Sequence, residues 1–148
     1  MKKYLTLTTI VVMTTVILTG CKKDNNNNTV AKTKTQLLTE GTWSLSALVS
    51  DRDANGTYET NDYAGYSACF KDNFHTFRSN GDLEVNEGPT KCNPADPETV
   101  IKHWQLTNNE NTLVVDSDND LIELSNTTLK IKLTLAGGMS FLSTFTKR

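Results

Sequence analysis

Apolar and polar residues alternate at every second position along much of this chain, which is the period of a β-strand rather than of a helix. From Trp43 to Val49 the odd-numbered positions are apolar, and most even-numbered positions carry a hydroxyl group. The run from Leu129 to Leu135 repeats the pattern, with lysine or threonine at the intervening positions. The pattern predicts eight short strands, at residues 43–49, 74–77, 83–85, 101–106, 113–115, 121–124, 129–135 and 139–145.

Turn residues separate these strands. Asn80-Gly81 is a strong hairpin signal, and three prolines place a loop at residues 88–98 because proline cannot join a central ladder. A short helical segment fits residues 36–40 or 63–68. Eight strands on tight turns predict an all-β protein, and an up-and-down antiparallel barrel would leave no unpaired edges. A two-sheet sandwich fits the same turn spacing. An eight-stranded barrel has an interior that is either filled by side chains or open to one small ligand.

The N-terminus has the pattern of a secretory signal. Lys2 and Lys3 precede a mostly apolar run of 14 residues from Leu5 to Leu18, which is too short to span a bilayer. The run ends in Leu-Thr-Gly-Cys at residues 18–21, which resembles the lipobox of bacterial lipoproteins. The resemblance implies cleavage of residues 1–20 and acylation of Cys21, so that acyl chains hold the protein on a membrane.

Residues 21–36 are asparagine-rich and almost without apolar side chains, which predicts a flexible tether. Residue 22 is Lys rather than Asp, and by resemblance to lipoprotein sorting this does not favour retention in the inner membrane. We therefore expect an extracytoplasmic, lipid-anchored protein at the outer membrane or cell surface of a Gram-negative bacterium. Residues 37–148 form one domain, which is long enough for a real core.

Charge and cysteine content narrow the function classes. The net charge is −2, and it becomes −4 when residues 1–20, with two lysines and no acids, are removed. No basic patch interleaved with aromatic residues occurs, so nucleic acid is not an expected partner. Cys69 and Cys92 remain after Cys21 is assigned to the lipid, and two cysteines in an exported chain most simply pair. The disulfide would close a loop of 24 residues and stabilise the fold by about 3 kcal/mol.

Several of these segments together resemble the lipocalin family. Gly41-Thr-Trp43-Ser-Leu45 is similar to the Gly-x-Trp that opens lipocalins, including the lipocalin-like domains of bacterial lipoproteins. The segment from Cys69 to Gly81, then Cys92, Trp104 and Leu113 to Val115, resembles the rest of the pattern, over roughly residues 37–147. The resemblance implies an antiparallel barrel and, less firmly, a ligand cavity. The last four strands are shorter and more closely joined than in long lipocalins, which predicts a reduced cavity.

The segment Asp51-Arg-Asp-Ala-Asn-Gly-Thr-Tyr-Glu-Thr-Asn-Asp62 has the spacing of a calcium loop, with Gly56 at the sharp turn. Two interpretations remain open, a calcium loop between strands and a solvated hairpin with Asn55-Gly56 at its tip. Position 12 is the short-armed Asp62, and the flanks are not helices, so an EF-hand pair is excluded. The acidic run 116–120 lacks the glycine and is expected to be a plain turn. The expected calcium ligands are Asp51, Asp53, Asn55, Thr57, Glu59 and Asp62.

No catalytic motif is present. His75 and His103, the two histidines, each lie in a strand pattern, and no nucleophile elbow, zinc-protease motif or phosphate-binding loop occurs. The large aromatic residues either line a cavity for an apolar ligand or fill the core of a small barrel. The predicted ligand-pocket residues are Trp43, Phe74, Phe77, Trp104, Phe141 and Phe145.

We therefore predict a non-enzymatic lipoprotein that binds a small apolar or amphipathic ligand inside a lipocalin-like barrel. The alternative is a structural or adhesion module with a filled core, stiffened by calcium at residues 51–62. The expected partners are the membrane, through the acyl chains, a small apolar ligand, and a protein at the envelope. Cavity volume distinguishes the carrier from the module.

Overall fold

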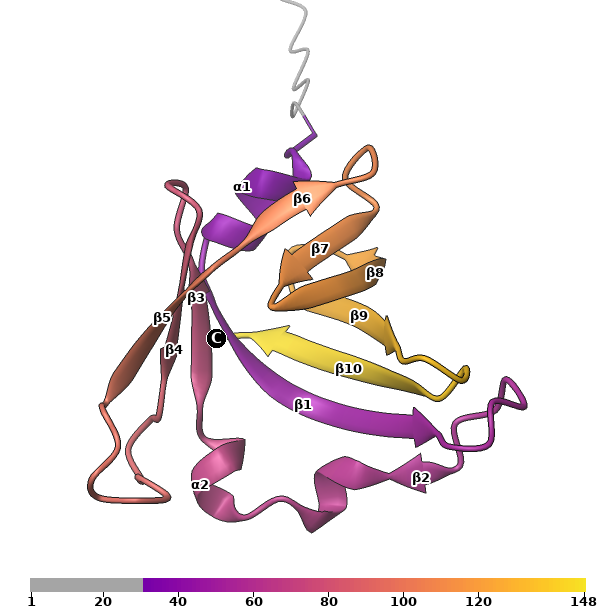
Figure 1. Cartoon of the computed structure of the whole chain (residues 1–148). Helices are drawn as coiled ribbons and strands as arrows, with labels where there is room; N and C mark the ends of the chain where they lie inside the picture. Colours follow the sequence, from indigo (N-terminus) through magenta and orange to yellow (C-terminus); the bar gives the residue numbers. More distant parts are fainter. Residues whose placement is uncertain (1–30) are drawn as a thin grey trace, which may run out of the picture. The chain divides into compact units, whose positions relative to one another are not determined.

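The computed structural model describes residues 31–148 (Figure 1). The signal peptide, Cys21 and most of the predicted tether lie outside the described residues, and the predictions made for them stay predictions. Among residues 31–148, no helix is long and apolar enough to cross a membrane. The elements are α1 (Lys34–Thr39), β1 (Thr42–Asp51), β2 (Thr60–Asn61), the 3₁₀ helix η1 (Asp62–Gly65), α2 (Ala68–Lys71), β3 (Phe74–Phe77), β4 (Asp82–Asn86), β5 (Thr99–His103), β6 (Gln105–Thr107), β7 (Thr112–Val115), β8 (Ser117–Leu124), β9 (Thr128–Thr134) and β10 (Ser140–Lys147).

The strands form one antiparallel sheet in the order β5-β4-β3-β1-β10-β9-β8-β7-β6, with β2 beside β1. Most neighbours in the sheet are also neighbours in sequence. The exceptions are at β1, which pairs with β3 as well as with β2, and which pairs with β10 from Trp43↔Lys147 to Asp51↔Ser140 and so joins the first strand to the last. A register shift between Leu45 and Ala47 interrupts this pairing. The long β1 curves through the middle of the sheet (Figure 1). The prediction of an all-β, antiparallel, up-and-down fold is confirmed.

The strand count and the closure of the barrel need correction. The described chain has ten strands rather than eight, because β2 is an additional two-residue strand and the strand expected at 101–106 divides into β5 and β6. In the described residues β5 pairs only with β4 and β6 only with β7, so the hydrogen-bonded sheet is not a closed ring. No backbone hydrogen bond joins its two end strands, β5 and β6, which are connected by the covalent chain at Trp104.

The break at Trp104 has a local cause. Its backbone N–H donates to the carbonyl of Gly81 (2.8 Å), and its indole Nε1 donates to the carbonyl of Arg78 (3.0 Å). Both acceptors belong to the turn between β3 and β4, so Trp104 is held by that hairpin and cannot pair with β7. Its ring packs edge-on against Phe77 at 5.3 Å between centroids, and it is almost completely buried.

The short helix α1 packs against one end of the core. It begins in a capping box, in which Thr33 and Gln36 each accept a backbone N–H of the other. Leu38 is fully buried, and the indole of the fully buried Trp43 donates to the Leu38 carbonyl (2.9 Å). The Lys147 ammonium lies 4.7 Å above the Trp43 ring centroid. The buried hydrophobic core comprises Leu38, Trp43, Phe77, Leu83, Trp104, Leu113 and Leu129.

The connection from β2 to β3 contains η1 and α2 and is tied to the rest of the domain by a disulfide. Cys69 in α2 is bonded to Cys92 in the loop between β4 and β5. The disulfide prediction is confirmed, and so is the irregular loop expected at residues 88–98. Gly88 has φ +68°, and a Cβ there would lie 2.4 Å from the Asp72 carbonyl oxygen, so this close approach of two backbones requires glycine.

Candidate functional site

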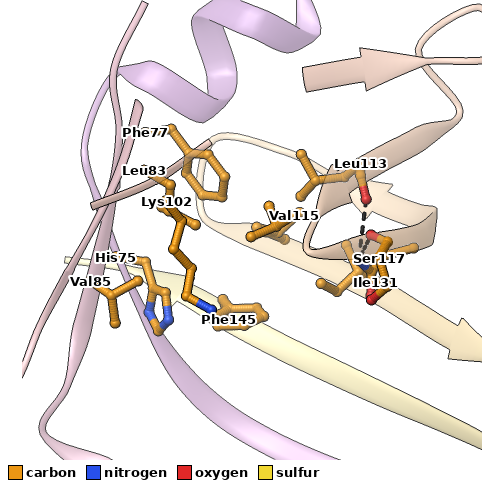
Figure 2. A pocket seen from close by; sticks show the side chains of 12 residues that line it. His75, Phe77, Leu83, Val85, Lys102, Leu113, Val115, Ser117, Ile131 and Phe145 are labelled. Carbon is orange, nitrogen blue, oxygen red and sulfur yellow. Dashed lines mark hydrogen bonds between the residues drawn. The ribbon is translucent and has the colours of Figure 1, made fainter. Parts of the chain in front are cut away.

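The curved sheet lines a half-open cavity of about 260 Å³ (Figure 2). Successive side chains of a strand point to opposite faces, so the five strands that contribute two lining residues each contribute them two positions apart, whereas β5 and β10 contribute one each. Eight of the twelve lining residues are apolar, and the other four carry polar groups, a composition typical of a small-molecule site. The lining residues are His75 and Phe77 from β3, Leu83 and Val85 from β4, Lys102 from β5, Leu113 and Val115 from β7, Ser117 and Asn119 from β8, Leu129 and Ile131 from β9, and Phe145 from β10.

Two of the polar lining residues have roles that the fold explains. The amide Nδ2 of Asn119 donates to the carbonyls of Leu113 (3.2 Å) and Ser117 (2.9 Å). This buried amide holds the turn between β7 and β8. Lys102 forms an ion pair with Asp116, the residue at the tip of that turn. Lys102 therefore connects β5 to a part of the sheet with which β5 shares no backbone pairing.

His75 is a polar group in an apolar environment. Its ring packs edge-on against Phe145, with 5.3 Å between centroids, and its Nδ1 is buried without a hydrogen-bond partner. Burial lowers the pKa of His75 below its ordinary value; the backbone of Trp43 opposes this shift, and the positive charge of Lys102 adds to it. The imidazole is therefore neutral at neutral pH. It gives the cavity wall a polar group without a fixed charge.

The predicted aromatic pocket residues fall into different environments. Phe77 and Phe145 line the cavity. Trp43 and Trp104 are buried core residues that are not part of its lining. Phe74 and Phe141 also do not line it: Phe74 alternates with the inward-facing His75, and Phe141 lies four residues along β10 from Phe145.

Sequence reasoning missed most of the residues that line the cavity. The aliphatic side chains of β4, β7 and β9 form much of the wall, and Lys102 and His75 supply its ionisable groups. The sequence did contain a signal for His75: it lies two residues before Phe77, so strand alternation places both side chains on the same face of β3. No sequence signal placed Lys102, because its inward position depends on the pairing of β5 with β4.

Three of the four acidic residues expected as ligands in the predicted calcium loop come together. Carboxylate oxygens of Asp51, Asp53 and Glu59 lie within 4.8 Å of one another. Asp51 is buried at the end of β1 and accepts the backbone N–H groups of Asn55 (3.1 Å) and Gly56 (2.9 Å).

The same loop also satisfies these acids internally. The side-chain amide of Asn55 donates to both Asp53 and Glu59 at 3.0 Å, and so already partners two of the three clustered carboxylates. Asp62 instead pairs with Arg52 at 2.5 Å and is not part of the cluster, and Thr57 donates its N–H to the Asn55 side chain (2.7 Å). Calcium binding at this loop stays a prediction.

The fold and the cavity define a small antiparallel β-barrel-like protein with an apolar interior site. The chain matches the family model described as "Lipocalin-like domain" over residues 39–131, which is more than half of its length. It belongs to the lipocalin-like domain family. A comparison with curated proteins gave no match.

Proposed function

We propose that this protein is a non-enzymatic binding protein that holds one small apolar or amphipathic ligand in the cavity of its lipocalin-like domain. The observation that supports the proposal is the cavity itself. The two faces of a completely filled barrel would meet at the apolar lining residues, whereas here about 260 Å³ stays open between them. This volume is just below the range typical of ligand pockets, roughly 300–1,000 Å³. A ligand of modest size therefore fits.

Binding of a neutral fluorescent probe, N-phenyl-1-naphthylamine, tests the proposal. We expect saturable binding of one probe per chain to the unacylated Cys21→Ser protein. Val115→Phe places a larger side chain in the cavity wall and should abolish binding. Ile122→Phe is the matched control, because Ile122 is 52% exposed on β8 and does not line the cavity. Equal binding by both variants, or no saturable binding by the parent, would contradict the proposal.

We also propose that the protein acts outside the cytoplasm, anchored to the outer membrane or cell surface of a Gram-negative bacterium through acylated Cys21. The sequence supports this with a positive N-terminus, a short apolar run and the lipobox-like Leu18-Thr19-Gly20-Cys21. Metabolic labelling with an alkyne-bearing palmitate in a Gram-negative host should mark the parent chain and leave Cys21→Ser unlabelled. Fractionation of the envelope and protease treatment of intact cells then distinguish a periplasmic from a surface location. An unlabelled parent chain would refute the anchor.

The second candidate function is a module stiffened by calcium, and the observation that favours it is the convergence of Asp51, Asp53 and Glu59. A single extracellular calcium loop binds at about 10⁻⁴–10⁻³ M, so about 10 mM calcium should raise the Tm by mass action. Asp53→Asn should remove the rise. Asp118→Asn, in the acidic segment at the start of β8, should keep it. A Tm that does not change with calcium in the parent chain would eliminate this function.

A further inference from the structure

One side of the cavity borders the gap in the sheet where β5 has no backbone pairing with the strands that follow it. The strand before Trp104, β5, pairs with β4. The strand after Trp104, β6, pairs with β7. The described residues show no backbone pairing between β5 and the turn from β7 to β8. Cavity residues nevertheless lie on both sides of this gap, with Lys102 on β5 and with Val115 and Ser117 on either side of the turn. Only side chains therefore close the cavity wall between Lys102 and the turn from Val115 to Ser117. We call this gap the slot.

The ion pair between Lys102 and Asp116 spans the slot. The Lys102 side chain is 38% exposed and that of Asp116 is 65% exposed. Exposed pairs of this kind stabilise a protein by only about 0–1 kcal/mol, because water solvates both partners. The ion pair can therefore open at little cost in free energy. Replacement of Asp116 by another anion also costs little, because water solvates the released carboxylate.

The charge of the cavity lining has one sign. Lys102 is the one formally charged residue among the twelve that line the cavity, and no carboxylate is among them. Figure 2 shows its side chain extending from β5 toward the end of the cavity where His75 and Phe145 lie. The Lys102 ammonium is half-exposed and attracts an anion at this end of the cavity, whereas the remaining wall is mostly apolar. The lining is therefore complementary to an apolar chain with one anionic end.

Volume limits the length of that chain. A water-sized group takes up about 30 Å³. A cavity of about 260 Å³ therefore holds roughly eight or nine such groups. This favours a medium-length chain over the long acyl chains of membrane lipids.

Resting on the function proposed above, we propose that the cavity binds a medium-chain amphiphile with a carboxylate head, which enters through the slot and replaces Asp116 as the partner of Lys102. The apolar tail then packs against the aliphatic wall and Phe145, and the head stays at the slot, close to water. Asp116 acts as an internal competitor that occupies Lys102 when no ligand is present. Lys102 is thus the residue that determines specificity for the head group.

Displacement of N-phenyl-1-naphthylamine by decanoate, decanol and decylamine tests this assignment with three heads on one tail length. We expect decanoate to displace the probe at about tenfold lower concentration than decanol, and decylamine to be the weakest. Lys102→Met keeps most of the side-chain volume and should abolish the preference for decanoate without changing decanol. Lys132→Met is the matched control, because Lys132 on β9 also forms an ion pair, with Asp120 at 3.3 Å, and does not line the cavity.

Asp116→Asn provides a second variant whose effect has the opposite sign. Removal of the competitor should strengthen decanoate binding by about twofold to fivefold, and it changes an exposed turn residue, so folding is not at risk. If the probe binds but decanoate and decanol compete equally, the head-group assignment is wrong while the proposed function stands. If the probe does not bind at all, both fail. Weaker decanoate binding by Asp116→Asn would overturn the exchange of partners.

Discussion

Replacement of Trp43 by Phe tests whether the indole hydrogen bond holds α1 on the core. The substitution removes the donor to the Leu38 carbonyl (2.9 Å) and leaves that buried oxygen without a partner. An unsatisfied buried acceptor costs about 1–3 kcal/mol. The smaller ring also loses roughly two buried carbon groups, or about 1–2 kcal/mol. We therefore expect the free energy of unfolding to fall by about 2–5 kcal/mol, a large share of the 5–15 kcal/mol typical of a domain.

The assay is urea unfolding of the oxidised protein, followed by far-ultraviolet circular dichroism, which reports backbone structure and does not depend on indole fluorescence. Thr33→Ala provides the matching perturbation from the other side of α1, since it removes the N-cap and costs about 1 kcal/mol by itself. If the Trp43 bond and the cap stabilise the same docked helix, the double variant should lose less than the sum of the two single losses. A loss below about 0.5 kcal/mol for Trp43→Phe, or strict additivity in the double variant, would refute the reasoning.

Three further substitutions test other parts of the structure. Joint replacement of Cys69 and Cys92 by serine should lower the free energy of unfolding by about 3 kcal/mol, because it opens a loop of 24 residues, counting both cysteines, and urea unfolding measures the loss. Burial lowers the pKa of His75, so in mildly acidic solution the unfolded chain binds a proton that the folded chain does not. The free energy of unfolding should therefore fall as the pH drops below about 6.5. This fall should vanish in His75→Gln but persist when the exposed His103 is changed to Gln. Gly88→Ala should lower the Tm, at a cost above about 1 kcal/mol, because its Cβ would lie 2.4 Å from a backbone carbonyl oxygen at the end of α2; an unchanged Tm would show that the two backbones can separate.

Most strands could be predicted because one face of each is buried and the other is not. The run at 74–77 coincides with β3, and the run at 129–135 differs from β9 by one residue at each end. The division of the strand at Trp104 could not be predicted, because it depends on hydrogen bonds to a turn more than twenty residues earlier. The two-residue β2 has too few residues to show any periodicity.

The candidate site was less predictable than the fold. Aromatic residues are conspicuous in a sequence, but size alone does not say whether a ring packs solidly in the core, as Trp43 does, or faces open space, as Phe145 does. That distinction depends on the registers of strands that pair across long stretches of sequence. The aliphatic wall of the cavity could not be predicted for the same reason, because Val85 and Ile131 have the pattern of ordinary strand residues. The shortness of the last four predicted strands did indicate a reduced cavity, and its volume is small.

The irregularity of the sheet and the chemistry of the cavity have a common origin at Trp104. Because the hairpin turn between β3 and β4 holds this residue, β5 diverges from the strands that follow it and leaves the slot. An unpaired edge with exposed apolar residues such as Val100 and Ile101 is a liability for aggregation. A sheet closed along its whole length would remove this liability, but it would also seal the side of the cavity where Lys102 meets water. The open edge is therefore consistent with a protein that exchanges its ligand through the side of the barrel, with the charge at that opening selecting the head group.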